Sequence, residues 1–531
     1  MPEFVKNSCF YPFAVCCGVL NTRPFAYDNT NQAKEFIMSI KPQYETYRYT
    51  GEVCRLNAQS IVECRLPGSE IGSVLAVQAK AVVSECACVD GEVRYGGKLL
   101  LCIVYEDGNK KICRAERGAE FYHKAEGAEV TPACFAKTQL VCENVSTRRE
   151  GSGLYISVVV GAHIRVYGGK NAEYLVGGEG LALQKQAITL CKSVCVSGET
   201  EGEDEFETDV LGDILLHSEN ALATSVQVKT GEITVEGETV VHVCVLKNDD
   251  SVCAYERIVP FRMQIPCDEA FGKVRASARV QVKSAQLQAA VDEEKGKSKM
   301  TLSYVLSADC FLYTLDEVEI ACDAFSPERE ITVKHENGTG MYLTNQNKFV
   351  QRVGGTASFS GEIDGEYALL ASVLPSAEIA CRKGENGWEA EGAVTAEVLL
   401  GGENGYKSAS LSLPFVFPID SEGDEVEASA IVCGLNVRRT KEGATDAEAT
   451  LKLCVRSYER KDWSYIKETE EGEEYPKTDA AISIYALREG EGLWDVAKRL
   501  HREPSELKKC NPELTFPVKA GERIFVYRQI K

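Results

Sequence analysis

The feature that most constrains the fold of this chain is a long internal repeat. A strand–turn–strand pattern occurs three times, and in each copy a glycine precedes an apolar run that leads to a phenylalanine. These pairs are Gly97 and Phe121, Gly237 and Phe261, and Gly392 and Phe415. Counted between the glycines, the repeat spans about 140 to 155 residues, whereas solenoid units span roughly 20 to 50. Each copy is therefore expected to be a whole domain.

Each copy closes with a strand that ends in tyrosine, at residues 154–167, 300–313 and 447–458. In the first of these, every second residue from Leu154 to Val166 is apolar, which is the period of a β-strand. The third alternates apolar with polar residues, so we expect one of its faces to be wet. Short strands separated by Gly, Asn and Asp are typical of sandwiches and barrels alike. The sequence predicts a mainly β chain with three tandem all-β, sandwich- or barrel-like domains.

The segments around these copies give the predicted boundaries. We expect β domains at 46–168, 186–314 and 328–458, an N-terminal segment at 1–45, an acidic linker at 459–480 and a C-terminal module at 481–529. A short helix is predicted at 32–40. The glycine-rich stretch 168–186 is interpreted as a hinge and the acid run 199–209 as a solvated loop. Residues 459–480 hold eight acids against four bases, which favours an exposed tether.

The C-terminal module has a different pattern. Its expected elements are, in order, a strand at 483–485, helices at 493–500 and 505–510, and a strand at 521–527. Apolar residues in the first helix have helical spacing, and Pro504 suits the first turn of the second. Asn511 suits a left-handed stop after that helix. The sequence therefore predicts a small βααβ unit.

This module resembles LysM domains, which share a βααβ fold and a shallow groove for N-acetylglucosamine polymers. The residues at family positions are Tyr485, Gly490, Leu493, Trp494, Val496, Ala497, Leu500, Leu507, Asn511, Val518, Gly521 and Ile524. The resemblance implies a groove between loops 488–493 and 511–519. Its expected partner- or glycan-binding residues are Arg488, Glu489, Gly490, Glu491, Gly492, Leu493, Asn511, Pro512, Glu513 and Leu514.

One departure from the LysM pattern affects the expected ligand. Glycan-binding members usually have Gly-Asp-Thr or Gly-Asp-Ser where this chain has Gly490-Glu491-Gly492, so the hydroxyl expected beside the sugar is absent. The expected core of the module is Tyr485, Trp494, Val496, Ala497, Leu500, Leu507 and Ile524. For Trp494 a core role is favoured over contact with a partner, because the module has few large residues.

Composition limits the compartment and the class of partner. The formal net charge is −21, which disfavours nucleic acid as a partner. Many of the 22 cysteines lie inside β-branched runs, where a free thiol behaves as a small apolar residue. No zinc-ligand spacing occurs, and no secretory signal or transmembrane segment is evident. We expect a cytoplasmic protein with reduced thiols and no metal or other cofactor.

With the module identified, the three β copies resemble the SPOCS domains of spore-coat morphogenesis proteins. The resemblance rests on residues 74–77, on the three strand–turn–strand copies and on the phenylalanines that follow them. Tandem SPOCS copies before one LysM domain are similar to the SipL-like family, and more distantly to proteins of the SpoVID type. This implies a scaffold in the mother cell, at the forespore surface, whose LysM domain binds the coat basement-layer ATPase (SpoIVA-type) and whose repeats contact other coat proteins.

Two alternatives to the scaffold stay open from the sequence. One is a peptidoglycan-binding protein at the cell wall or spore cortex. The other is a hydrolase, but no Gly-x-Ser-x-Gly elbow occurs, and the two phosphate-loop near matches lack the required spacing of glycine, lysine and hydroxyl. We therefore predict no catalytic residues and a chain that is not an enzyme.

Overall fold

The computed structural model describes residues 40–68, 71–151, 153–292, 297–360, 367–403, 405–439, 445–476 and 482–527. The predicted helix at 32–40 lies outside these ranges except for its last residue. The described chain is mainly β, as predicted, with two short helices near the C-terminus. Nearly all strands pair antiparallel with a neighbour in sequence or with the strand that closes the same repeat.

The first repeat is a sandwich of two sheets. Its strands are β1 (Lys41–Pro67), β2 (Ile71–Val89), β3 (Glu92–Asp107), β4 (Ile112–Glu126), β5 (Phe135–Glu150) and β6 (Gly153–Glu179). The sheets have the orders β1-β6-β5 and β2-β3-β4. Every second residue of β6 from Leu154 to Val166 is at most 2% exposed and packs against the inner face of β3. The alternation that predicted the strand therefore buries one face between the sheets.

The second and third repeats have the same strand order as the first, except that the third has an additional two-residue strand, β14, at the edge of its second sheet. The second contains β7 (Ala182–Thr208), β8 (Gly212–Lys229), β9 (Glu232–Lys247), β10 (Val252–Pro266), β11 (Arg275–Asp292) and β12 (Lys297–Phe325). The third contains β13 (Arg329–Thr356), β14 (Ser358–Phe359), β15 (Ala368–Gly384), β16 (Gly387–Gly402), β17 (Gly405–Ile419), β18 (Glu425–Arg439) and β19 (Thr445–Glu474). Their sheets are β11-β12-β7 with β10-β9-β8, and β13-β19-β18 with β14-β17-β16-β15. All three repeats are sandwiches, which decides between the two predicted architectures.

The three sandwiches are packed in a ring, each with an outer sheet face against an edge strand of the next. Val104, Cys244 and Leu399 each lie seven residues after the repeat glycine, and the structure brings all three into one apolar cluster. Bulges in β2 and β8 turn Leu75 and Leu215 into the same cluster. A bulge adds a residue to one strand and re-aims its side chain, so these leucines leave their own sheets to join the repeats.

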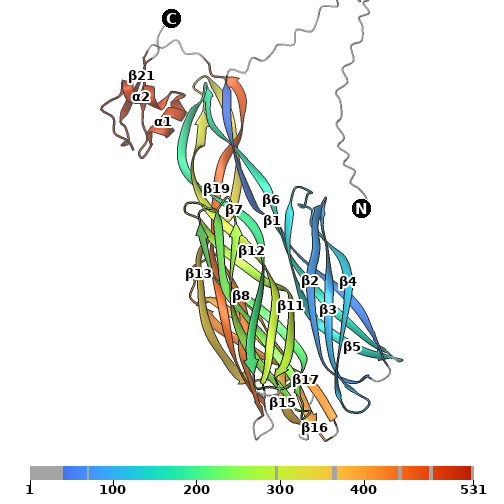
Figure 1. The fold of residues 1–531 in the computed structure, drawn as a ribbon. Coiled ribbons are helices and arrows are strands. Elements are labelled where there is room, and N and C mark those ends of the chain that lie inside the picture. Colours follow the sequence, from blue (N-terminus) through green and yellow to red (C-terminus); the bar gives the residue numbers. More distant parts are fainter. Residues whose placement is uncertain are drawn as a thin grey trace, which may run out of the picture.

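The closing strand pairs continue beyond the sandwiches and form a stalk. We use this name for residues 41–52 and 167–179, 182–193 and 313–325, and 329–344 and 458–474, which pair as three antiparallel ribbons. Figure 1 shows the stalk rising from the body of the repeats. Tyr174 and Leu175 of the first ribbon are buried in it with Leu190 of the second and Trp463 and Ile466 of the third.

The stalk corrects two predictions. The expected hinge at 168–186 consists of the ends of β6 and β7 around a turn at Gly180, and the expected tether at 459–480 is strand as far as Glu474. The predicted domain boundaries consequently cut through continuous strands. These two segments were not recognised as strands because they are rich in glycine or acidic residues. Their apolar residues at every second position are buried only by packing against the other ribbons.

Two smaller predictions also change. The acid run 199–209 is not a loop, because it belongs to β7 as far as Thr208, with its glutamates exposed on one face. The face of β19 expected to be wet is partly covered, since Cys454 and Arg456 are 0% and 3% exposed. Cys454 packs against Leu222 and Val240 of the second repeat. Packing between repeats thus buries the second face of a strand whose pattern indicated only one buried face.

Buried cysteines behave as the sequence predicted for small apolar residues. Cys244, Cys310 and Cys454 are buried and unbridged. Burial raises the pKa of the Cys244 and Cys310 thiols to about 12, so both are protonated at neutral pH. Such thiols are weak nucleophiles.

The C-terminal module has the predicted βααβ order. It consists of β20 (Ile482–Ala486), α1 (Leu493–Leu500), α2 (Pro504–Cys510) and β21 (Arg523–Tyr527). The two strands pair antiparallel. Figure 1 shows the helices beside the end of the stalk.

Candidate functional site

The two loops expected to form the groove of the C-terminal module are joined by backbone hydrogen bonds. The amide of Gly490 donates to the carbonyl of Val518 at 3.0 Å, and the amide of Val518 donates to the carbonyl of Glu491 at 3.1 Å. Gly490 has a φ of +81°, in the left-handed region that glycine adopts without strain. The structure therefore places loops 488–493 and 511–519 side by side, although they are separated by both helices in sequence.

The carboxylate of Glu491 is directed back into its own loop. It accepts hydrogen bonds from the backbone amide of Arg488 at 2.8 Å and from the guanidinium of Arg499 at 2.9 Å. The Arg488 amide, more than Arg499, lowers the pKa of Glu491. Glu491, which stands where glycan-binding LysM domains usually have aspartate, is thus engaged inside the loop and does not project toward a ligand.

Asn511 has a structural role that the sequence did not indicate. Its side-chain amide donates to the carbonyls of Leu507 and Phe525, and its side-chain oxygen accepts from the amide of Phe525. Its φ of −133° excludes the predicted left-handed stop, and at 7% exposure it does not line a groove. A buried amide that satisfies three backbone groups fixes α2 against β21.

The remaining loop residues divide into an exposed and a packed set. Arg488, Glu489, Gly490, Pro512 and Glu513 are exposed, while Gly492 is half-buried. Gly492 begins α1, where its amide donates to Asp495 at 2.9 Å. Leu493 and Leu514 pack against the module core. The exposed groups of the predicted residues are therefore one cation, two carboxylates and backbone, and the second loop also exposes Thr515 and Lys519.

Most of the predicted core residues of the module are buried. Val496, Ala497, Leu507 and Ile524 are at most 2% exposed, and Leu500 is half-buried against them. Tyr485 does not belong to the core, because it is 40% exposed. Leu487, Val518 and Val526 complete the core instead. Helical spacing identified the buried face of α1, whereas β20 is exposed at four of its five residues, Tyr485 among them.

Trp494 joins the module to the stalk. Its indole Nε1 donates to Asp323 of β12 at 2.8 Å, and its ring lies edge-on to Phe325 with ring centroids 5.1 Å apart. Lys498, one turn later on α1, donates to both oxygens of Asp323 at 2.7 Å. Trp494 thus packs half-buried against the module core, as expected, and in addition joins the module to the stalk, which was not expected. The sequence feature that could have indicated this contact is the position of Trp494 in the first turn of α1, one helical turn before Lys498 on the same face of the helix.

A second contact secures the module. His501 follows α1 in a left-handed conformation, and its ring stacks on Tyr475 at the end of the stalk with centroids 3.7 Å apart. The exposed loop residues Arg488, Glu489 and Glu513 take part in neither contact. The module is consequently held at the stalk end with its two loops facing outward.

The three repeats meet below the stalk around one carboxylate. Glu427 of β18 pairs with Arg165 of the first repeat, with Arg279 of the second at 2.8 Å, and with Arg456 of the third at 3.9 Å. Burial opposes ionisation of Glu427, but the three arginines outweigh it and lower the pKa to about 2. The tyrosines that close each repeat, Tyr167, Tyr313 and Tyr458, pack together beside this group.

A cavity of about 280 Å³ adjoins the Glu427 group and is lined by all three repeats. Its charged groups pair with one another, as Arg55 does with Glu52 at 2.5 Å and with Glu425 at 2.7 Å. Because these charges are already matched, the group acts as an internal connection between the repeats.

Among the residues that the structure describes, no cluster of His, Cys, Asp or Glu is placed to hold a metal ion. No helix within the described ranges is long and apolar enough to span a membrane. Comparison of the chain with models of known protein families and with curated proteins finds no match.

Proposed function

We propose that the chain is a non-enzymatic scaffold in spore coat assembly. In this proposal the C-terminal module, which resembles a LysM domain, binds the coat basement-layer ATPase (SpoIVA-type) at the forespore surface, within the mother-cell cytoplasm. The three repeats, which resemble SPOCS domains, contact other coat proteins. The proposal rests on the resemblance of both parts to the SipL-like family.

The observation that carries the proposal is the state of Glu491. Its carboxylate is bonded to Arg488 and Arg499, in a loop that lacks the hydroxyl found in glycan-binding LysM domains. The exposed polar groups of the two loops are mainly charged side chains and backbone, with the hydroxyl of Thr515 in the second loop as the exception. This charged surface suits a protein partner better than a chain of neutral sugars. Charge complementarity of this kind sets specificity and association rate in protein complexes.

The attachment of the module supports a scaffold role. Contacts with Asp323 and Tyr475 fix it to the stalk, and the stalk is continuous with the closing strands of all three repeats. A partner on the outer loops is therefore held at a set position relative to the repeats. Several modest contacts on one such body strengthen binding through effective concentration.

The test compares two loop variants of the full chain with a matched control. Arg488→Ala and Glu513→Ala remove exposed charges from the two loops, and Lys509→Ala removes an exposed charge from α2 outside them. In calorimetry at micromolar concentration with the purified ATPase, the loop variants should bind at least about tenfold more weakly and the control normally. Absence of binding by the unmodified chain would refute the proposal.

The same proteins distinguish the peptidoglycan alternative. Each is sedimented with purified sacculi. Retention of the unmodified chain that is lost in the loop variants would assign the module to glycan, whereas no retention agrees with a protein partner.

A further inference from the structure

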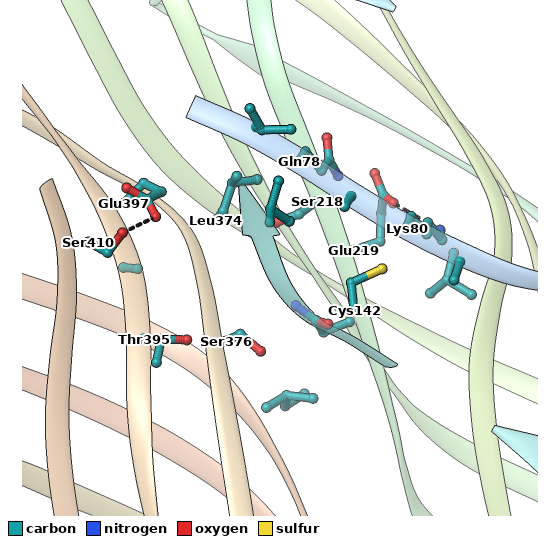
Figure 2. A pocket seen from close by; sticks show the side chains of 18 of the residues that line it. Gln78, Lys80, Cys142, Ser218, Glu219, Leu374, Ser376, Thr395, Glu397 and Ser410 are labelled. Atoms are coloured by element: carbon teal, nitrogen blue, oxygen red, sulfur yellow. Dashed lines mark hydrogen bonds and ion pairs between the residues drawn. The ribbon is translucent and has the colours of Figure 1, made fainter. Parts of the chain in front are cut away.

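An open groove of about 790 Å³ lies where the third repeat faces the first and the second. One wall is the outer face of β16 and β17 with β14 beside it. The others are β2 and β5 of the first repeat, β8 and β11 of the second, and β15 and β18 of the third. Figure 2 shows the side chains that line it, with Glu397 and Ser410 on one side and Gln78, Lys80 and Ser218 across from them. Its volume is within the range of sites that bind ligands, about 300–1,000 Å³.

At two of the three junctions between repeats, the residue five positions after the repeat glycine bonds to the next repeat. At the third junction this bond is missing within the described ranges, and the groove lies in its place. Cys102, His242 and Glu397 occupy the same place in the three repeats, five residues after the repeat glycine. The thiol of Cys102 donates to the carbonyl of Leu215 in the second repeat at 3.6 Å, and Nε2 of His242 donates to the carbonyl of Val432 in the third at 3.1 Å. Each of these groups thus bonds the edge strand of the next repeat.

Glu397 has no such contact. Its carboxylate accepts a hydrogen bond from Ser410 of its own repeat at 2.6 Å, and no cation pairs with it in the part of the chain that the structure describes. Burial raises the pKa of Glu397. A half-buried carboxylate without a counter-ion is costly in a folded protein, and a cation supplied by a ligand would remove that cost.

The other walls of the groove are uncharged or already paired. Lys80 forms an ion pair with Glu219 at 3.6 Å, and Glu219 also bonds His217. Ser376 and Thr395 present hydroxyls, and the hydroxyl of Ser218 is buried without a hydrogen-bond partner. Among the described residues that line the groove, no unpaired cation is available to attract phosphate or another anion. The lining therefore favours a ligand with amide or hydroxyl groups and one positive charge.

Backbone geometry indicates the shape of that ligand. Within the described residues β2 pairs only with β3, β8 only with β9 and β15 only with β16. Residues of all three line the groove, so strand edges without a ladder partner lie beside it. The ladder of β15 is interrupted between Val373 and Ser376, and Leu374 there has a φ of +54°. A leucine in the left-handed region is strained, and such strain is concentrated at functional sites. Unpaired edges bind extended peptides by adding a strand.

We propose that this groove binds an extended segment of a partner protein that carries a lysine or arginine, whose cationic group pairs with Glu397. Backbone groups of the segment hydrogen-bond along the open strand edges, and its uncharged side chains contact the hydroxyl-lined walls. The inference deepens one part of the proposed function, that the repeats contact proteins, and rests on it. It does not depend on what the C-terminal module binds.

The test uses a phage-displayed random-peptide library on the full chain. Enriched peptides should contain Lys or Arg among uncharged, strand-forming residues. In fluorescence anisotropy these peptides should bind Glu397→Gln at least about tenfold more weakly than the unmodified chain. Replacing the peptide's basic residue by norleucine should weaken binding similarly, and should have no further effect on Glu397→Gln.

Two further variants make the result specific to the groove. Glu391→Gln is the matched control, because Glu391 lies on the same strand and face as Glu397 but pairs with Arg382 at 3.0 Å, and it should bind peptides normally. Ser376→Trp should block binding by filling the groove, with unchanged thermal unfolding showing that the chain still folds. No enriched peptide, or peptides that bind Glu397→Gln and Ser376→Trp normally, would overturn the inference. Binding of Glu397→Gln and Ser376→Trp to the coat ATPase, measured in parallel, tests the proposed function of the C-terminal module separately.

Discussion

Gly237 lies directly opposite Phe261 in the ladder of β9 and β10, and the phenyl ring fills the space above the glycine. A Cβ on Gly237 would be 2.4 Å from Cζ of Phe261 and 2.2 Å from the carbonyl oxygen of Leu222. Gly97 faces Phe121 and Gly392 faces Phe415 in the same register. The pair that marks the repeat in sequence is therefore a cross-strand contact in which a missing side chain admits an aromatic ring.

Replacing Gly237 by alanine should destabilise the second repeat. Neither the ring nor the backbone carbonyl has room for a methyl group, so we expect a loss of about 1–3 kcal/mol in the free energy of unfolding, typical of overpacking. Urea titration, with hydrogen exchange along β9 and β10, measures it. Gly169→Ala is the control, since nothing lies within 4 Å of its Cβ position. Equal stability of the two variants would contradict this account of the repeat.

Replacing Glu427 by glutamine should loosen the junction of the repeats. The change leaves the Arg165, Arg279 and Arg456 charges without their shared anion, and breaking a buried ion pair costs about 3–5 kcal/mol. Urea titration near pH 7 measures the loss in the free energy of unfolding. A loss within the ±0.5 kcal/mol of ordinary surface changes would show that the arginines are stabilised by other groups.

The contribution of Glu427 should also depend on pH. Its pKa is lowered from 4.5 to about 2 in the folded state, so its stabilisation is complete above the unfolded value and is lost as the pH falls from about 4.5 to 2. The shift corresponds to about 3 kcal/mol. The stability difference between the unmodified chain and Glu427→Gln should shrink over this interval. A constant difference would mean that the Glu427 carboxylate is not the titrating group.

Replacing Asp323 by asparagine should release the C-terminal module from the stalk. Burial of Asp323 raises its pKa, but hydrogen bonds from Lys498 and Trp494 outweigh this, and the net pKa is lowered. The carboxylate is therefore charged and holds both donors. We expect the fluorescence of Trp494 to shift to the red and small-angle scattering to show a larger particle. Glu319→Gln, an exposed site on the same strand, should change neither.

Replacing Trp494 by alanine should undock the module without unfolding it. The indole is half-buried against the module core and contacts Asp323 and Phe325 of the stalk, so we expect its removal to weaken the stalk contact more than the fold of the module. Leu507→Ala should instead unfold the module, because Leu507 is 2% exposed and truncation of such a leucine costs about 2–5 kcal/mol. Amide spectra of β20 and β21 distinguish the outcomes. Loss of the native β21 signals in Trp494→Ala would show that its contact with the module core outweighs its contact with the stalk.

Local patterns predicted the candidate site only in part. Helical spacing located α1 and its buried face, and the two loops were expected together from the resemblance to LysM domains. Asn511 was misplaced because its three hydrogen bonds go to backbone groups that become neighbours only after α2 packs on β21. The contact of Trp494 with the stalk was missed because its partner Asp323 lies 171 residues away. Glu397 was not singled out, although it stands where the other repeats have Cys102 and His242.

The sequence by itself determined the β-strands, the threefold repeat and the βααβ module, because alternation, helical spacing and the glycine–phenylalanine pairs are properties of short stretches of chain. Only the tertiary structure decided that the glycine-rich and acid-rich segments form a stalk and that Tyr167, Tyr313 and Tyr458 meet near Glu427. The physical reason is that a strand's pattern shows which side chains must be buried but not what buries them. Here the burying surface belongs to another repeat, in some cases more than a hundred residues away along the chain, as Trp463 is from Tyr174.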